Sequence, residues 1–413
     1  MFPFTIKVNV ILLIVFLLQT TAYGQDRTIT SKLNPGCEDC GLNSTLIYVK
    51  AEGLKDTIHQ IWDFTQGIPT MILAVGGVNS SIDINWNGSK PNNFSMVGKP
   101  RYSCATAIDK IYEYNDLEDT GRFDVNHPYR MQALKNVSWE LKESVLTSKK
   151  VMVRLRGTLH DKERRGTIDM KLDYVNFTDY ARTLPHLIHN ANTTLVDISL
   201  VNLTTSRHFN SSRFAVHFVL VSKDPNNLSM RSITRKSLDD EHTPGVFEII
   251  EIKSPSLWIS GAGGFLQFRP VAYVESKRNV GSSTLAHVSN FTRGTLPQSS
   301  TLETFYEGYD EKNLLVQDLV VSFGEPGDGF YKQHNYTAWS YTLGYGWPPS
   351  ESLSLLAVLI ISLGLCVPAV LVAVGGVLVV ARRRSRPPTS PSHPSHLTDE
   401  DSLERRCNSF RTV

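Results

Sequence analysis

The sequence predicts a mainly β exoplasmic region of the antiparallel β-sandwich type, followed by one transmembrane helix. The strand prediction rests on period-two alternation, which is clearest where Ile168, Met170 and Leu172 alternate with Asp169 and Lys171. The helix prediction rests on residues 353–381, an uncharged apolar run that is long enough to cross the hydrocarbon core of a bilayer. The exoplasmic region, of about 325 residues, exceeds the usual size of one hydrophobic core, so the length favours two packed units.

The N-terminus predicts a cleavable signal peptide. Lys7 precedes a short apolar run, and small residues follow at Ala22 and Gly24. We therefore expect residues 1–24 to be removed before Gln25. An uncleaved signal anchor is the competing interpretation, but the apolar run is short for a membrane span.

The exoplasmic cysteines are Cys37, Cys40 and Cys104, because Cys366 lies in the apolar run and Cys407 lies after it. Three cysteines can close at most one disulfide. Both a tight Cys37–Cys40 ring and a longer loop to Cys104 are compatible with the sequence, and the longer loop would restrict the unfolded chain more. A Cys-x-x-Cys zinc site would need a second cysteine pair that the chain lacks. We predict no metal and no cofactor.

N-glycosylation is the strongest exoplasmic signal. Twelve of the chain's twenty-three asparagines head an Asn-x-Ser/Thr sequon, whereas chance would give about three or four. None of the twelve lies in the signal peptide, the span or the segment after it. The predicted glycosylation sites are Asn43, Asn79, Asn87, Asn93, Asn136, Asn176, Asn192, Asn202, Asn210, Asn227, Asn290 and Asn335. Glycans at these sites would cover most of the exoplasmic surface with sugar.

Period-two runs recur along the exoplasmic region, designated 25–350. They are separated by turn residues, as expected for a sandwich of many short strands. Pro185 and the polar residues after it suggest a possible division near residue 188. The runs lie at 45–50, 71–75, 137–141, 151–159, 168–174, 194–203, 214–221, 246–252, 265–274 and 314–323.

A last alternating run ends close to the predicted span. Trp339, Tyr341, Leu343, Tyr345 and Trp347 alternate with small or hydroxyl-bearing residues. One interpretation is an aromatic belt at the membrane interface or a docking face for a membrane partner. The other is an ordinary core strand that happens to be the last one.

The sequence contains no catalytic motif that we recognise: no Gly-x-Ser-x-Gly elbow, no His-Glu-x-x-His and no phosphate-binding loop. The densest titratable cluster, at 237–245, is typical of a solvated loop. The scattered histidines have no metal-ligand spacing; they are His59, His127, His160, His208 and His217. The nearly balanced net charge of +2 gives no reason to expect a nucleic-acid partner.

The predicted transmembrane helix (353–381) is followed by four arginines, Arg382, Arg383, Arg384 and Arg386. The positive-inside rule places the segment after it, 382–413, in the cytosol as a tail. Small residues recur within the span at helical spacing and would form one face suited to a neighbouring transmembrane helix. This candidate partner face consists of Ser362, Cys366, Ala369, Ala373 and Gly376. The other interpretation is that small residues are simply common in such helices.

Several stretches resemble the glycosylated lysosomal membrane protein family. They are residues 237–247, residues 264–273, and Tyr331-Lys332-Gln333-His334 followed by Trp339-Ser340 and the Gly-Trp-Pro-Pro sequence before the span. The resemblance is specific over 227–381 and weaker before it.

The resemblance implies a type I glycoprotein of the lysosomal membrane, with most of the chain in the lumen. It further implies a non-enzymatic accessory subunit of a multi-span dipeptide transporter of the major facilitator type, which it shields from luminal proteases. The predicted partners are therefore that transporter and membrane lipid. The alternative is an exoplasmic hydrolase or a glycan- or ligand-binding receptor, which would need a convergent pocket. The tail has no tyrosine, so it contains no tyrosine-based sorting signal.

Overall fold

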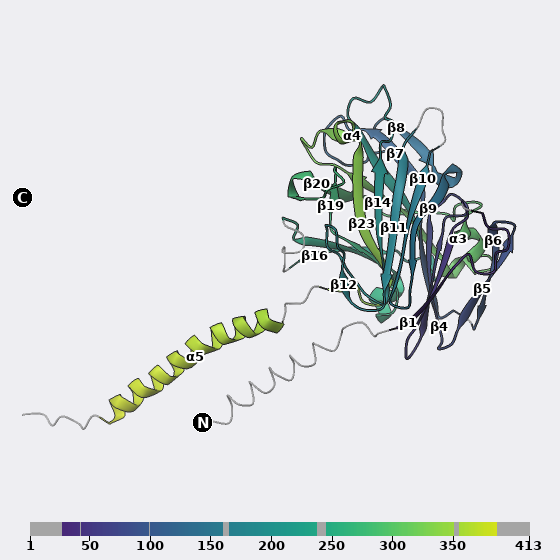
Figure 1. The fold of residues 1–413 in the computed structure, drawn as a ribbon. Helices are drawn as coiled ribbons and strands as arrows, with labels where there is room; N and C mark the ends of the chain where they lie inside the picture. The colour runs from purple at the N-terminus through teal and green to yellow at the C-terminus, as the bar shows by residue number, and fades with distance from the viewer. Residues whose placement is uncertain are drawn as a thin grey trace, which may run out of the picture. The chain divides into compact units, whose positions relative to one another are not determined.

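The computed structural model describes residues 27–41, 43–98, 100–159, 165–237, 245–350 and 355–385. The predicted signal peptide and tail residues 386–413 lie outside this part of the chain. Two compact units are present, Met1–Glu351 and Ser352–Val413. The first contains a β-rich domain, and the second contains the apolar helix α5 (Leu355–Arg384) (Figure 1). The predicted class, mainly antiparallel β with one candidate transmembrane helix, is confirmed.

One sheet, which we call the central sheet, is built on the long strand β7. Strand β15 pairs along one edge of β7, and β4 and β8 pair along the other. Strands β3, β2 and β1 continue from β4, while β22 and β21 continue from β15. Its strands are β1 (Thr28–Leu33), β2 (Leu46–Glu52), β3 (Thr57–Asp63), β4 (Thr70–Gly76), β7 (Tyr102–Asn115), β8 (Tyr129–Ala133), β15 (Ser212–Ser222), β21 (Thr292–Arg293) and β22 (Leu315–Phe323).

The second sheet, which we call the outer sheet, has the order β9-β10-β11-β14-β23-β18-β17-β16, with every neighbouring pair antiparallel. Strand β20 (Ser283–Val288) pairs with β19 (Val271–Tyr273) and with β22, so it links the two sheets. The outer sheet comprises β9 (Ser138–Leu146), β10 (Lys150–Thr158), β11 (Thr167–Val175), β14 (Thr193–Val201), β16 (Arg231–Lys236), β17 (Glu248–Lys253), β18 (Gly264–Phe268) and β23 (Tyr336–Tyr345).

The two sheets pack face to face around one large apolar core. The ring of Phe218 on β15 meets Trp339 and Tyr341 on β23 edge to face, at 5.8 and 5.4 Å between centroids. At the β9 side, Trp139 Nε1 donates to Gly67 O at 2.7 Å, and the ring of Trp139 packs against Phe64. These contacts confirm the predicted β-sandwich packing.

A further layer covers the far face of the central sheet. It consists of the hairpin of β5 (Ser81–Asn87) and β6 (Lys90–Val97) together with helix α3 (Thr301–Phe305), and a second apolar cluster fills the space beneath them. Thr301 of α3 also donates to the buried carboxylate of Asp63 on β3. Because both faces of the central sheet are covered, every residue of β3, β4 and β15 is buried.

The remaining elements are short. They are β12 (Asp179–Tyr180), β13 (Ile188–His189), α2 (Pro255–Ser260), α4 (Phe330–His334) and the single 3-10 turns η1 (Leu134–Asn136), η2 (Val280–Ser282) and η3 (Glu311–Asn313).

The possible division near residue 188 is not a boundary between compact units. It falls at β13, and strands on either side of it pair with one another: β7 with β15, and β11 with β14. The same apolar core includes residues from Ile29 to Leu343. The two expected units are therefore two sheets of one domain, because each sheet needs strands from both halves of the chain.

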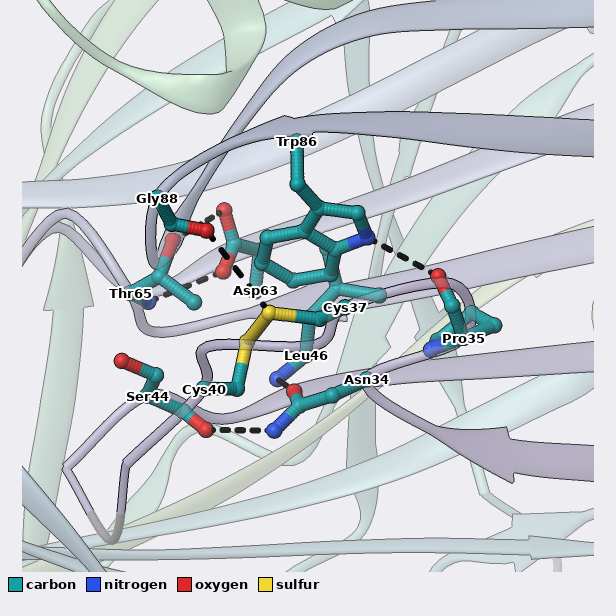
Figure 2. The surroundings of a disulfide bond; sticks show 10 residues. All are labelled: Asn34, Pro35, Cys37, Cys40, Ser44, Leu46, Asp63, Thr65, Trp86 and Gly88. Atoms are coloured by element: carbon teal, nitrogen blue, oxygen red, sulfur yellow. Dashed lines mark hydrogen bonds between the residues drawn. A yellow bond between two sulfur atoms is a disulfide. The ribbon is translucent and has the colours of Figure 1, made fainter.

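The disulfide joins Cys37 to Cys40, so the tight ring is the pairing that forms, and Cys104 is a buried thiol on β7. Figure 2 shows the ring beside the turn of the β5–β6 hairpin, where Cys37 Sγ lies 3.7 Å from Gly88 O and Trp86 Nε1 donates to Pro35 O. Asn34 closes the loop by bonding both Ser44 O and Leu46 N at 2.7 Å.

Candidate functional site

All twelve predicted glycosylation sites lie on described residues, and none is buried. Asn176 and Asn192 are half-buried. The other side chains are exposed, namely those of Asn43, Asn79, Asn87, Asn93, Asn136, Asn202, Asn210, Asn227, Asn290 and Asn335. A glycan must remain in water, so every site is placed where a sugar can be accommodated without disturbing the core.

Three sequon asparagines occupy left-handed backbone positions. Asn79, Asn202 and Asn335 have φ values of 65°, 51° and 53°. Asparagine tolerates this conformation better than most residues, so it suits the turns that join or end strands. The sequon and the turn coincide at these positions because asparagine is both the glycan acceptor and a residue that tolerates the left-handed conformation of the turn.

Asn192 differs from the other sequon residues because its side chain also supports the fold. Its Oδ1 accepts from Arg27 Nε at 2.8 Å, and its backbone carbonyl accepts from Tyr345 N at 3.1 Å. Arg27 in turn pairs with Asp56 at 2.7 Å. A glycan on the amide nitrogen would leave the Oδ1 bond available, so glycosylation and this bond are compatible.

A buried charge cluster surrounds Arg213 of β15, whose side chain is 3% exposed. Its guanidinium bonds Asp116 Oδ2 at 2.8 Å and Asp328 at 2.6 and 2.7 Å, and it also bonds Asp119. Burial favours a raised pKa for Asp328, but hydrogen bonds from Thr284 and Arg213 outweigh it and the pKa is lowered. The cluster ties two loops to the central sheet, and sequence spacing could not reveal it because its members lie far apart in the chain.

The histidines that the sequence singled out are not brought together. His59 is fully buried between Tyr48 Oη and Ser80 Oγ, both at 2.8 Å, and burial lowers its pKa to about 4. His217 of β15 bonds Asp109 of the neighbouring strand β7 at 2.5 Å. Because Ser80 Oγ donates to Gly77 O, it accepts from His59 Nε2, and Tyr48 then donates to Nδ1. These histidines therefore serve the packing of the central sheet.

No group of three or more histidine, cysteine or carboxylate side chains that could hold a metal occurs among the described residues. The acidic cluster at 237–245 falls largely on residues 238–244, which lie outside them, as does His160. Two grooves have volumes of about 380 Å³, beside Phe94 and Phe305, and about 340 Å³, beside Leu296 and Leu314. Apolar side chains form much of both linings.

The aromatic run before the span divides between the two interpretations. Trp339, Tyr341 and Leu343 of β23 are 1%, 0% and 5% exposed, so they are core residues. The belt interpretation is wrong for them, because β23 lies in the middle of the outer sheet and faces β15. Trp347 follows β23 and is 64% exposed.

Helix α5 is the candidate membrane anchor. Residues Ile360–Arg384 form a helix that is long and apolar enough to cross a membrane. The candidate partner face is exposed at Ser362, Cys366, Ala369, Ala373 and Gly376. Their spacings of four and three residues place them on one side of a continuous helix, although Pro368 interrupts its backbone bonding.

Comparison with known proteins places this geometry in context. The model of the glycosylated lysosomal membrane protein family matches residues 45–386. The chain belongs to this family. It is 29% identical to glycosylated lysosomal membrane protein B of Xenopus laevis, over 90% of this chain and 94% of that protein. It is 28% identical to the Danio rerio protein, over 88% and 91%, and 25% identical to the Homo sapiens protein, over 82% and 84%.

The resemblance found in the sequence is therefore confirmed, and it extends further than the motifs indicated. The family match begins at residue 45, just before β2, and continues through α5. It covers the central sheet from β2 onwards as well as the membrane-proximal strands, whereas β1 lies before it. The family takes its name from glycosylated proteins of the lysosomal membrane, in agreement with the sequons and the candidate span.

Proposed function

We propose that the chain is a non-enzymatic accessory subunit of a multi-span lysosomal transporter of the major facilitator type that carries dipeptides. In this proposal it stabilises the transporter and protects it from luminal proteolysis. The chain would be a type I protein of the lysosomal membrane, with the β-rich domain in the lumen and residues after Arg382 in the cytosol. The arginines that follow the span support this orientation.

The observation that carries the proposal is the distribution of the sequons. Twelve surface positions from Asn43 to Asn335 are available to glycans. In the same domain, the buried guanidinium of Arg213 is paired with Asp116 and Asp328. Sugar on these positions would obstruct proteases sterically over much of the luminal surface. A glycan-covered domain beside a transporter would extend this obstruction to the transporter's luminal loops.

The exposed side chains of α5 support a partner within the membrane. Lipid gives little hydrophobic drive for helix association, so helices pair where small side chains let their backbones approach. The face from Ser362 to Gly376 offers such side chains, and leucine and valine dominate the opposite side.

Affinity purification of the full chain in mild detergent, followed by mass spectrometry, tests the proposal. The expected result is stoichiometric recovery of one multi-span transporter. The matched control is a chain in which residues 353–381 are replaced by the span of an unrelated type I protein, which keeps the luminal domain and reduces recovery. Recovery of a soluble luminal ligand without any multi-span protein would contradict the proposal and favour the receptor alternative.

A further inference from the structure

The chain leaves the β-rich domain at a fixed point. Gly346 N donates to Gly263 O at 2.9 Å, and Gln267 Nε2 donates to Pro349 O at 3.1 Å. Helix α5 begins at Leu355, six residues later in the chain. Six extended residues span at most about 22 Å.

The same end of the domain exposes large apolar side chains. Trp347 is 64% exposed and Ile259 is 62% exposed. Gly261, which ends α2 two residues after Ile259, lies against the indole of Trp347: a Cβ at Gly261 would be 3.5 Å from Nε1. Next to Ile259 on α2, the ring of Trp258 has the guanidinium of Arg231 stacked over it at 3.7 Å. We call these four side chains, Arg231, Trp258, Ile259 and Trp347, the juxtamembrane patch.

The helix that presents the patch is held rigidly. Asp224 Oδ1 accepts from Ser256 N at 2.8 Å in the first turn of α2, and Tyr102 Oη donates to Ser254 Oγ at 2.8 Å just before it. At the other end Gly261 takes a left-handed conformation and donates to Leu257 O. The side chains of Trp258 and Ile259 therefore stand on a helix that is fixed to the central sheet, and this helix does not need to be ordered on binding.

Three of the four patch residues, Arg231, Trp258 and Ile259, lie in the longest interval between sequons. No sequon occurs between Asn227 and Asn290, and this interval contains β16, β17, α2 and β18. Asn192 lies near the same end of β23, but on the side of β14, whereas the chain continues over β18 on the other side. None of the four patch residues is a sequon asparagine, and the sequon nearest to them in sequence is Asn227, four residues before Arg231.

We propose that the juxtamembrane patch rests on the bilayer, with Trp347 and Ile259 in the headgroup region and Arg231 facing lipid phosphates. Tryptophan is favoured at membrane interfaces because its ring is apolar and its N–H finds polar partners there. Arginine supplies a planar donor for phosphate oxygens. The short connection to the span keeps the bilayer at high effective concentration, so a small patch suffices. This proposal is independent of any transporter.

The first test uses the full-length chain in nanodiscs of phosphatidylcholine with an anionic lipid and no other protein. Lipids with a nitroxide near the headgroup quench tryptophan emission at short range. We expect wild-type emission to be quenched and Trp347→Phe to lose much of that quenching. Trp86→Phe is the matched control, since Trp86 is held in the β5–β6 hairpin by Pro35, and it should leave the amount of quenched emission unchanged. Equal quenching in the wild type and Trp347→Phe would overturn the proposal.

The second test places a spin label on Ile259→Cys in a background with Cys366→Ser and Cys407→Ser. The control label is on Val125→Cys, 66% exposed in the loop before β8, at the opposite end of β7 from Tyr102. Collision with oxygen, which partitions into lipid, should be enhanced at residue 259, and collision with a water-soluble nickel chelate should be reduced. The same collision profile at both positions would contradict bilayer contact of the patch. This holds also if a protein partner, and not lipid, normally covers the patch.

Discussion

The β-rich domain buries most of its large apolar side chains in internal clusters, whereas the described side chains of α5, at 360–384, are all exposed. The domain also neutralises its buried charges internally, as Arg213 does with Asp116 and Asp328. The helix has no such internal partners. The difference indicates that the domain is held together by its own contacts, while α5 depends on lipid or another protein.

Removal of Arg213 should give the largest effect on the domain. Arg213→Met leaves the carboxylates of Asp116 and Asp328 buried without their cation, and breaking a buried ion pair costs about 3–5 kcal/mol. Chemical denaturation of the purified chain measures the loss. The control is Arg156→Met, whose bidentate pair with Asp169 is exposed and should cost less than about 1 kcal/mol. Alkaline extraction should leave both variants in the membrane, because α5 is untouched; equal destabilisation of the two variants would contradict the account.

Acid should weaken the domain through its buried histidines. Burial lowers the pKa of His59 from 6.5 to about 4, so the unfolded chain binds more protons between these values. The contribution of neutral His59 to the free energy of unfolding is fully present above pH 6.5. It is lost as the pH falls towards 4, by on the order of 3 kcal/mol. His59→Gln should flatten this part of the pH–stability profile. His208→Gln, at an exposed position, should leave it unchanged, and a profile that His59→Gln does not alter would contradict the assignment.

A helix-face swap should affect the partner without affecting the domain. Ala369→Leu with Ala373→Leu places bulk on the candidate partner face, whereas Val370→Leu with Val374→Leu places it on the opposite side. We expect the first pair to reduce co-purification of the transporter severalfold and the second to have little effect. The melting temperature of the domain should not change in either variant. Equal recovery in both would remove this face from the interface.

Glycan removal should have the smallest effect on folding. None of the twelve sequon asparagines is buried, so a peptide N-glycosidase should lower the apparent mass in many steps while the free energy of unfolding changes little. The rate of proteolysis should rise, because the sugar no longer obstructs access. An unchanged electrophoretic mobility would contradict glycan occupancy.

The sequence missed two central strands that bury several polar side chains, although it predicted β4 and β15, which are buried on both faces and largely apolar. Strand β11 has a polar side chain at every second position, so its alternation was visible. Strand β3 was not predicted, because Thr57, His59, Gln60 and Asp63 are polar and yet buried, Gln60 against Thr194 of the outer sheet. No local sequence pattern shows that other elements cover both faces of this strand. The long strand β7 was missed for the same reason, since Ser103, Thr106 and Glu113 are also buried.

Local motifs were predictable and long-range contacts were not. The sequons and the apolar run are contiguous in sequence, so they could be read directly. The disulfide remained open between two pairings, and only the fold separates Cys104, on a core strand, from the loop that holds Cys37 and Cys40. The partners of Arg213 lie about 100 residues away on either side, at Asp116 and Asp328, and no spacing rule connects them.

The most direct test of the central claim is the half-life of the transporter in lysosomes, measured by pulse-chase in cells with and without this chain. Cells without the chain should lose the transporter rapidly, and luminal protease inhibitors should restore its half-life. Wild-type chain should rescue it, and a chain with all twelve sequons changed from Asn to Gln should rescue it poorly even where it still co-purifies. A transporter half-life that is the same in the presence and absence of the chain would contradict the proposed role.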